Sequence, residues 1–164
     1  MDGPLDAEEI LAVETYAGSQ YRLINGCLRG DEPCTTRILT MIGAIDRAIN
    51  RSRLPADLIL FRGIGGDAAA AIRSSGIAVG SMMFDDAFMS TSIDPRTAGM
   101  FAQFPPGGLM LRIRAPKGMN ALDMAPYSPY AREREFLLPR GTVLRVLGYN
   151  SSASELECEV VING

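Results

Sequence analysis

The sequence predicts an α+β fold in which a helical part, about residues 1–55, precedes a mainly β part, about residues 56–164. Apolar residues recur at helical spacing in the first third, whereas later apolar segments are short and bounded by Gly and Pro. Because helices precede strands instead of alternating with them, a largely antiparallel sheet system is favoured. The 164 residues suffice for one domain with its own core, and we expect a single domain.

Three helices are predicted in the N-terminal third. Asp6 is suited to cap the first, and Glu9 three residues later completes the spacing of a capping box. Gly18 is expected to end this helix, and a second short helix follows it. A third, longer helix is expected between Pro33 and Pro55. Its apolar face consists of Ile38, Met41, Ile42, Ile45 and Ile49.

The rest of the chain is expected to consist mostly of strands. These are predicted at residues 58–62, 87–92, 109–114, 133–138, 142–149 and 155–162. Short helices are predicted at residues 67–74 and 95–104, and a long loop at residues 117–130. The loop is predicted because prolines, tyrosines and small residues interrupt any apolar pattern there.

The composition excludes several classes of function. The chain has no histidine, which rules out Ser-His and Cys-His catalytic pairs and histidine-containing zinc sites. Catalysis must therefore use carboxylates, arginine, tyrosine, hydroxyls or backbone groups. The net charge of −3 argues against non-specific binding to nucleic acid. No apolar run is long enough to span a bilayer, and the acidic N-terminus does not resemble an export signal.

The three cysteines, Cys27, Cys34 and Cys158, are odd in number and lack the spacing of metal ligands. We expect reduced thiols in a fold that does not depend on disulfides. No metal site is predicted from this pattern.

Arg62 is the first candidate for chemistry. It ends a short apolar strand, where an unpaired charge is costly to bury, and Gly63 lets a ligand approach the backbone. The planar guanidinium suits a phosphate or a carboxylate. Taken alone, such an arginine is more often part of a structural ion pair.

The second candidate is the run Ser90, Thr91 and Ser92. Side chains alternate between the two faces of a strand, so Ser90 and Ser92 share one face and Thr91 points to the other. Taken alone, these are more often ordinary polar residues of a strand.

The third candidate is the pair Glu133 and Glu135. Carboxylates at i and i+2 project from one face of a strand, where like charges raise the proton affinity of one of them. Such a pair can divide roles, one stabilising positive charge and one taking up a proton. A solvated strand edge is the commoner interpretation of the isolated motif.

Together and in this order, the motifs resemble the arginine–serine–glutamate class of mono-ADP-ribosyltransferases. The family pattern is aromatic-Arg-Gly or aromatic-Arg-Arg, then Ser-Thr-Ser, then Glu/Gln-x-Glu. This chain has Phe61-Arg62-Gly63, Ser90-Thr91-Ser92 and Glu133-Arg134-Glu135.

The resemblance extends beyond these motifs to most of the chain, residues 5–149. Residues 14–29 are similar to the helical region of the bacterial exoenzyme branch, which includes binary actin-modifying and vegetative insecticidal toxins. Residues 135–142 resemble the strand and turn that follow the family's catalytic glutamate. The implied fold has two packed antiparallel sheets, a helical N-terminal part and a cleft between the sheets.

The resemblance also implies roles for the catalytic residues. Arg62 would bind a phosphate of NAD, and Ser90 would hydrogen-bond Glu135. Glu135 would stabilise the oxocarbenium-like charge that develops as nicotinamide leaves. Glu133 would take a proton from an acceptor arginine, because a guanidinium must lose a proton before it attacks carbon. The implied reaction consumes NAD as a substrate and transfers ADP-ribose to an arginine of a target protein.

Further residues are implied in binding. NAD-binding roles are implied for Tyr21, Asn25, Gly63, the backbone of Ile64, Thr91, Ser92 and Phe101. Tyr127 and Tyr130, in the loop before the glutamates, are implied in substrate recognition. Phe101 is equally compatible with a place in the core.

The chain departs from the family in one place. Residues 103–104 are Gln and Phe, where many relatives carry a second phosphate-binding arginine. Arg22 or Arg29 is expected to provide that contact instead.

Other functions stay open at this point. Residues 63–68 fit the G-x-G-x-x-A motif of NAD(P)-dependent oxidoreductases, with Asp85 or Asp86 as the ribose-binding acid. The charge of Arg62 and the lack of alternating strands and helices argue against this function. An NAD glycohydrolase would use the same residues, and a nucleic-acid base could replace arginine as acceptor. A module that only binds is disfavoured by the complete set of catalytic residues.

The resemblance implies a toxin or effector that acts in the cytoplasm of a target or host cell. Because no signal peptide is visible, we expect secretion by another route or as part of a larger effector. The implied partners are a target macromolecule and an immunity protein, and no membrane partner is expected. The target depends on surface loops, which diverge among relatives.

Overall fold

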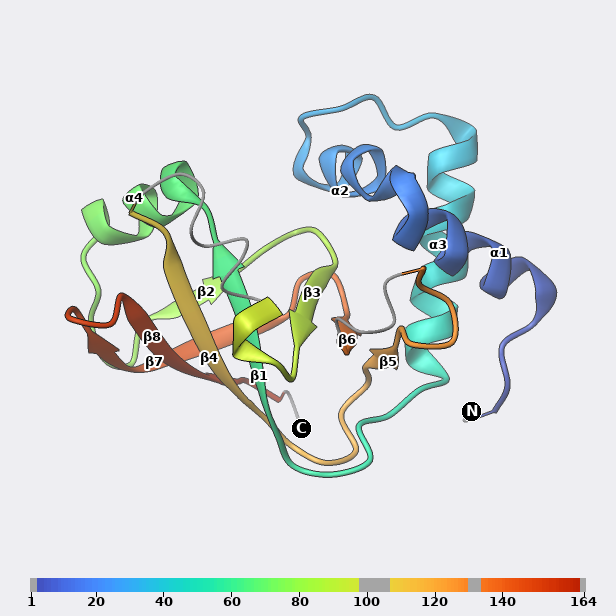
Figure 1. Ribbon diagram of the computed structural model, residues 1–164. Coiled ribbons are helices and arrows are strands. Elements are labelled where there is room, and N and C mark those ends of the chain that lie inside the picture. Colours follow the sequence, from blue (N-terminus) through green and yellow to red (C-terminus); the bar gives the residue numbers. More distant parts are fainter. Residues whose placement is uncertain (1–2, 98–106, 130–133, 163–164) are drawn as a thin grey trace.

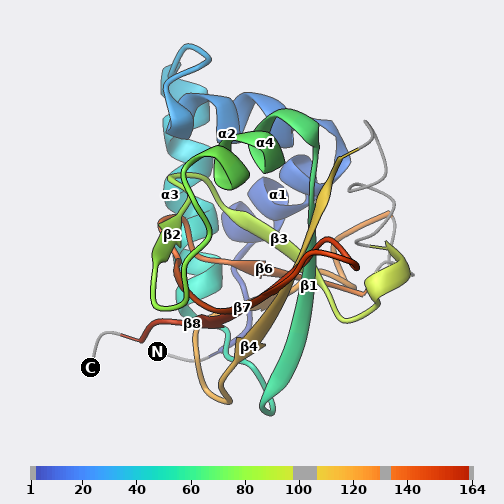
Figure 2. The same ribbon diagram turned by 90° about the vertical axis from the view of Figure 1, so that its left-hand side faces the viewer.

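The computed structural model describes residues 3–97, 107–129 and 134–162, and it places a group of helices on one side of a bent sheet (Figure 1). The helical part consists of α1 (Ala7–Thr15), a π-helical turn η1 (Tyr16–Gln20), α2 (Tyr21–Arg29) and α3 (Thr36–Asn50). From the side, these helices lie behind the strands (Figure 2). A further helix, α4 (Gly66–Ser74), follows the first strand.

The described residues after α3 also form eight strands. Their bounds are β1 (Leu58–Ile64), β2 (Met82–Phe84), β3 (Met89–Ser92), β4 (Leu109–Ala115), β5 (Leu122–Asp123), β6 (Glu135–Leu138), β7 (Val143–Asn150) and β8 (Glu155–Val160). The α+β class and the helical N-terminal part are confirmed. The short strands β2 and β5 were not predicted, because three and two residues are too few to show a period.

A buried carboxylate ties the first helix to the third. Asp6 and Glu9 form the predicted capping box, with hydrogen bonds of 2.8 and 3.0 Å between each carboxylate and the other residue's N–H. The side chain of Glu9 is fully buried, and Arg51 on the far end of α3 donates to it at 3.1 Å. Arg47 lies 3.6 Å from the same carboxylate. Glu9 therefore caps α1 and holds it against α3.

Gly18 does not end the first helix, contrary to expectation. The chain instead passes through the π-helical turn η1 into α2, which ends at Gly30 in a left-handed conformation (φ 84°). Glycine suits this position because it has no Cβ to clash.

The prediction that all three cysteines are reduced thiols is wrong for Cys27 and Cys34, which form a disulfide. After Gly30 the chain folds back on α2, because the N–H groups of Asp31 and Glu32 both donate to the Gly26 carbonyl. This turn brings the two cysteine Cα atoms to 5.0 Å. Such a close approach arises from backbone geometry, which cysteine count and spacing do not reveal.

The strands form one sheet in the order β2-β7-β8-β4-β1-β3-β6-β5. Neighbouring strands are antiparallel except for β4 and β8, which are parallel. The pairing between β1 and β3 is short, because its register consists of the pair Phe61 and Ser92. This joint divides the sheet into a five-stranded portion, β2 to β1, and a three-stranded portion, β3-β6-β5.

The two portions pack against each other across a shared apolar core. We call this the sheet core; its larger members are Leu54, Leu60, Met89, Leu109, Leu111, Ile113, Leu138, Leu144, Val146 and Leu156. The predicted pair of packed sheets therefore corresponds to two portions of one continuous sheet.

A second apolar cluster, the helical core, lies on the other face of the three-stranded portion. It includes Val13, Ile24, Ile38, Ile42, Ile45, Ile49, Phe88, Leu122, Met124 and Leu137. Adjacent residues Leu137 and Leu138 of β6 face the two different cores. The strands β3, β6 and β5 thus form a middle layer between the helices and the remaining strands (Figure 1).

The topology rules out the dinucleotide-binding interpretation of residues 63–68. Strand β1 has antiparallel neighbours on both sides, β3 and β4, whereas that motif requires a parallel strand after a crossover helix. In the described part of the chain, no helix is long and apolar enough to cross a membrane.

Candidate active site

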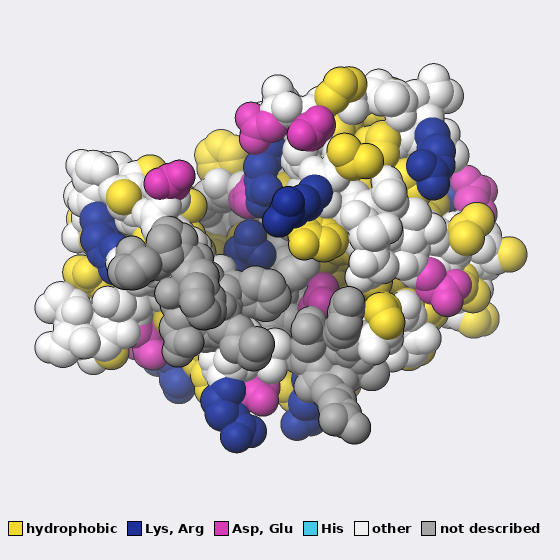
Figure 3. Space-filling view, turned by 45° about the horizontal axis from the view of Figure 1, so that its top comes forward, with side chains coloured by type: hydrophobic (Ala, Val, Ile, Leu, Met, Phe, Trp, Pro, Cys, Tyr) yellow, Lys and Arg dark blue, Asp and Glu magenta, His cyan; other side chains and the backbone are white. Residues whose placement is uncertain are grey.

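A cavity of about 520 Å³ lies between the helical part and the middle layer of strands. On the helical side it is lined by Tyr16, Ala17, Gly18, Tyr21, Asn25 and Arg29. On the strand side it is lined by Phe61, Arg62, Gly63, Phe88, Ser90, Thr91, Ser92, Thr97, Ser128 and Glu135. Figure 3 shows basic and acidic side chains gathered at the hollow between the two parts.

The register of β3 and β6 places the polar motif residues on one face. Ser92 pairs with Glu135, and Ser90 pairs with Leu137. Because directly opposed residues of an antiparallel pair share a face, Ser90, Ser92 and Glu135 lie on the helix-facing side. The expected hydrogen bond from Ser90 to Glu135 stays a prediction. Thr91 links β3 to β6, because its hydroxyl donates a hydrogen bond of 2.8 Å to the Phe136 carbonyl.

Arg62 reaches the cavity from the joint of the sheet. Its Nη1 donates to the Ser90 carbonyl at 3.0 Å, and its Nη2 lies 3.8 Å from the Asp85 carboxylate. Burial lowers the pKa of the guanidinium, and the charge of Asp85 opposes that shift. Arg62 remains a cation at neutral pH, held next to the strand that carries the serines.

Asp85, in the connection between β2 and β3, also binds the arginine on the opposite wall. The Arg29 Nε and Nη2 atoms donate to its two carboxylate oxygens at 3.0 and 2.7 Å. Burial alone would raise the pKa of Asp85, but the hydrogen bonds from Arg29 and from the Ala87 N–H outweigh it and hold the pKa below its usual range. Of the two arginines expected to supply a second phosphate contact, Arg29 lines the cavity and Arg22 does not.

Tyr16 lines the helical side of the cavity and was not predicted as a site residue. Its ring is buried and contacts the edges of Tyr21 and Phe88, with ring centroids 6.4 and 6.0 Å away. Its hydroxyl accepts a hydrogen bond of 2.9 Å from Asn25. Burial raises the pKa of Tyr16, while hydrogen bonds with Ser90 and Asn25 oppose that shift. Tyr16 thus links the two walls of the cavity.

Among the described residues, two predicted site residues are absent from the lining of this cavity. The Ile64 side chain packs against the sheet core, while the predicted role of its backbone stays a prediction, and Tyr127 is half-buried against the helical core. Phe101, Tyr130 and Glu133 lie outside the described residues. Sequence reasoning missed Tyr16, Phe88, Thr97 and Ser128 as lining residues. Tyr16 had a weak signal, since it stands within the helical segment that resembles the toxins.

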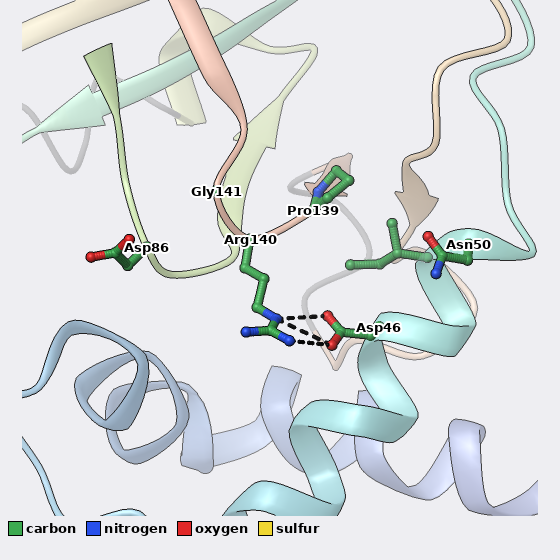
Figure 4. Close-up of a pocket in the computed structure, with 7 residues that line it drawn as sticks. Asp46, Asn50, Asp86, Pro139, Arg140 and Gly141 are labelled. Atoms are coloured by element: carbon green, nitrogen blue, oxygen red, sulfur yellow. Dashed lines mark hydrogen bonds and ion pairs between the residues drawn. The ribbon is translucent and has the colours of Figure 1, made fainter. Parts of the chain in front are cut away.

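A second cavity, of about 420 Å³, lies between α3 and the turn that joins β6 to β7 (Figure 4). It is lined by Asp46, Ile49, Asn50, Asp86, Pro139, Arg140 and Gly141. Arg140 donates to both oxygens of Asp46 at 3.0 to 3.1 Å and so ties this turn to the helical part. Within residues 3–97, 107–129 and 134–162, no group of three or more Cys, Asp or Glu could hold a metal ion.

A protein-family model matches nearly the whole chain. The model described as ADP-ribosyltransferase exoenzyme matches residues 4–163. Exoenzyme S of Pseudomonas aeruginosa is 28% identical over 141 residues, which are 85% of this chain and 28% of that protein. An NAD(+)–arginine ADP-ribosyltransferase of Enterococcus faecalis is 27% identical over 142 residues, which are 83% of this chain and 28% of that protein. The chain thus spans little more than a quarter of these relatives.

Solved structures share the fold over almost the full chain. The toxin Plx2a from Paenibacillus larvae has a TM-score of 0.78 at 23% identity, covering 96% of this chain and 88% of that one. Exoenzyme S bound to human 14-3-3 protein beta and carba-NAD has a TM-score of 0.76 at 21% identity, covering 94% and 74%. The C3 exoenzyme of Clostridium limosum has a TM-score of 0.79 at 19% identity, covering 96% and 87%.

Proposed function

The chain belongs to the ADP-ribosyltransferase exoenzyme family, and from this premise we propose that it transfers ADP-ribose from NAD to an arginine of a target protein. The observation that carries the proposal is the cavity between the helices and β3–β6. It brings together Arg62, the Ser90–Ser92 run and Glu135 from three separate segments. The chain would act as a single catalytic domain.

The walls of the cavity match the chemistry of NAD. Two guanidiniums, Arg29 and Arg62, offer donors to a diphosphate, and aromatic rings line the cavity nearby. The carboxylate of Glu135 faces the same space and would lie beside the nicotinamide ribose. Preorganised negative charge at this point favours a reaction in which positive charge develops on the sugar.

The reaction follows from these groups. The bond between the ribose C1′ and the nicotinamide nitrogen breaks, and its electron pair leaves with nicotinamide. Glu135 stabilises the resulting oxocarbenium-like charge. An Nη atom of the acceptor arginine then attacks C1′, and its proton passes to Glu133, the carboxylate that family resemblance assigns to this step. The products are ADP-ribosyl-arginine, nicotinamide and a proton.

The names of relatives support the acceptor and the setting. One relative is named an NAD(+)–arginine ADP-ribosyltransferase, and another is named a secreted exoenzyme. We therefore propose a secreted effector that acts in the cytoplasm of a target cell, with a target protein and an immunity protein as partners.

Incubating the chain with a lysate and NAD labelled in the adenylate moiety tests the function. Label that stays on macromolecules and is removed by protease indicates transfer to protein, and mass spectrometry then locates the modified arginine. Label removed by nuclease indicates a nucleic-acid acceptor. Free ADP-ribose as the only labelled product indicates an NAD glycohydrolase.

A further inference from the structure

Asp85 stands between the two cationic walls of the cavity. Arg29 comes from α2 in the helical part, and Arg62 comes from β1 at the joint of the sheet. The Asp85 carboxylate binds Arg29 through two hydrogen bonds of 3.0 and 2.7 Å and lies 3.8 Å from the Arg62 Nη2 atom. One acidic side chain thus contacts both guanidiniums.

The backbone around Asp85 fixes the carboxylate independently of Arg29. Its Oδ1 accepts a hydrogen bond of 3.0 Å from the Ala87 N–H, and its carbonyl accepts one of 2.9 Å from the Gly141 N–H. The Arg29 side chain, in contrast, is 39% exposed and makes its described hydrogen bonds to Asp85 alone. Asp85 is therefore the fixed member of the pair, and Arg29 takes its position from it.

The geometry leaves Arg29 able to bind an anion. Asp85 occupies the Nε and Nη2 side of the guanidinium, while Nη1 and the second Nη2 hydrogen remain as donors. Without a carboxylate between them, two neighbouring guanidiniums repel each other, and a long exposed arginine adopts many rotamers. Asp85 removes both obstacles before the ligand arrives.

We propose that Asp85 is a positioning residue that holds Arg29 beside Arg62, so that the two arginines form one binding site for the diphosphate of NAD. This inference rests on the proposed function and gives Asp85 a role in the transferase site, in place of the ribose-binding role that the excluded oxidoreductase motif suggested. Asp85 acts through Arg29 and does not touch the reacting ribose.

The test replaces Asp85 by Asn, which keeps the shape but places an amide NH₂ against the Arg29 donors. We expect the Kd of NAD, measured by calorimetry, and the KM for NAD hydrolysis to rise about tenfold, the effect of losing one charged hydrogen-bond pair. The kcat is expected to stay within about twofold, because the reacting groups are unchanged.

The pair Asp46 and Arg140 supplies a matched control (Figure 4). It is also a bidentate carboxylate–arginine pair between the helical part and the strands, but it lies outside the NAD cavity. Both Asp85→Asn and Asp46→Asn should lower the Tm, because each breaks a bidentate pair, but Asp46→Asn should leave the Kd of NAD within about twofold of the wild type. An equal effect of both substitutions on the Kd would overturn the inference.

A double-mutant cycle with Arg29→Gln separates positioning from a general structural effect. If Asp85 acts through Arg29, adding Asp85→Asn to Arg29→Gln raises the Kd by no more than about twofold. If the two effects multiply, Asp85 acts by another route and the proposal fails. If Asp85→Asn does not fold, the test uses the variant Arg29→Lys, which changes an exposed residue at the end of α2 and cannot form the bidentate pair. An unchanged Kd of NAD in Arg29→Lys would then refute positioning by that pair.

The same measurements show whether the role of Asp85 alone is wrong or whether the proposed function is wrong as well. A wild-type chain that binds no NAD overturns both proposals. A wild-type chain that binds and hydrolyses NAD, with Asp85→Asn unchanged in Kd and KM, overturns the role of Asp85 alone.

Discussion

The carboxylate of Glu135 is expected to carry the cleavage step. Glu135→Gln keeps the shape and removes the charge that faces the developing cation, so nicotinamide release should fall about a hundredfold to a thousandfold. Release is measured by chromatography at saturating NAD. Glu157→Gln on β8 is the control, since Glu157 pairs with Arg114 away from the cavity. Equal rates for Glu135→Gln and wild type would refute the assignment.

Glu133 is expected to serve the acceptor and not the cleavage. Glu133→Gln should therefore retain much of the NAD hydrolysis while transfer to arginine is lost, because the guanidinium keeps its proton. Both activities are measured on one preparation with labelled NAD. Wild-type labelling of the natural target by this variant would point to a different acceptor, such as a nucleic-acid base. Equal loss of hydrolysis in both glutamate variants would mean that the pair acts as one electrostatic unit.

Cys158 is expected to be an unreactive thiol in the folded chain. It is fully buried, and burial raises its pKa to about 12, so at pH 8 only about one molecule in ten thousand carries the thiolate. Alkylation by iodoacetamide at pH 8 should be slow until denaturant is added. The raised pKa also means that the thiol's contribution to stability is present below the unfolded pKa of about 8.5 and is lost as the pH rises toward 12. Rapid alkylation in native buffer would contradict this prediction.

Single residues of the site differ in how far the sequence could reveal them. The sequence points to Arg62, Ser90 and Glu135, which line the cavity, because they stand in short motifs whose order is specific. Tyr16 and the contacts of Asp85 were missed, because their roles depend on which segments meet in space. Asp85 was considered only as a ribose-binding acid, whereas the fold places it against two arginines.

At the scale of elements, the disulfide between α2 and the segment before α3 is expected to stabilise the fold. Replacing Cys27 and Cys34 by Ser should lower the free energy of unfolding by about 2–3 kcal/mol, as estimated for a short closed loop. Urea unfolding followed by circular dichroism measures this, and a thiol reductant should lower the wild-type midpoint equally. The reductant should not affect the double variant; a similar drop there would show that the disulfide is not its target.

Elements whose apolar residues recur over a full helical or strand period were predicted well, and elements without such a period were not. The capping box, the apolar face of α3 and the alternation in β4 carry their own signals, and all three appear in the structure. The π-helical turn at Gly18 was missed because a glycine near the end of a helical pattern usually stops it. The turn that closes the disulfide depends on carbonyl contacts that follow from the fold.

At the scale of the whole molecule, the α+β class was predictable because helices and strands are segregated along the chain. The packing of two sheet portions was implied by family resemblance. The order of strands and the parallel pair β4 and β8 were not, since strand order depends on long-range pairing. The two cores lie on opposite faces of β3 and β6, and the cavity lies on the helix-facing side of these strands, where Arg62 enters it from the joint of the sheet.

The narrow joint between β1 and β3 has a consequence for how the molecule opens. Where Phe61 and Ser92 form the register, little backbone hydrogen bonding couples the two portions, so the shared sheet core is what holds them together. The portion that loses less of this core on opening can open at a lower free energy than the other. Native-state amide exchange should give one opening free energy for β4, β7 and β8, and another for β3, β6 and the helices. Bound NAD, which contacts both sides of the joint under the proposed function, should bring the two values closer together. A single opening free energy for all protected amides without NAD would show that the joint transmits unfolding in full.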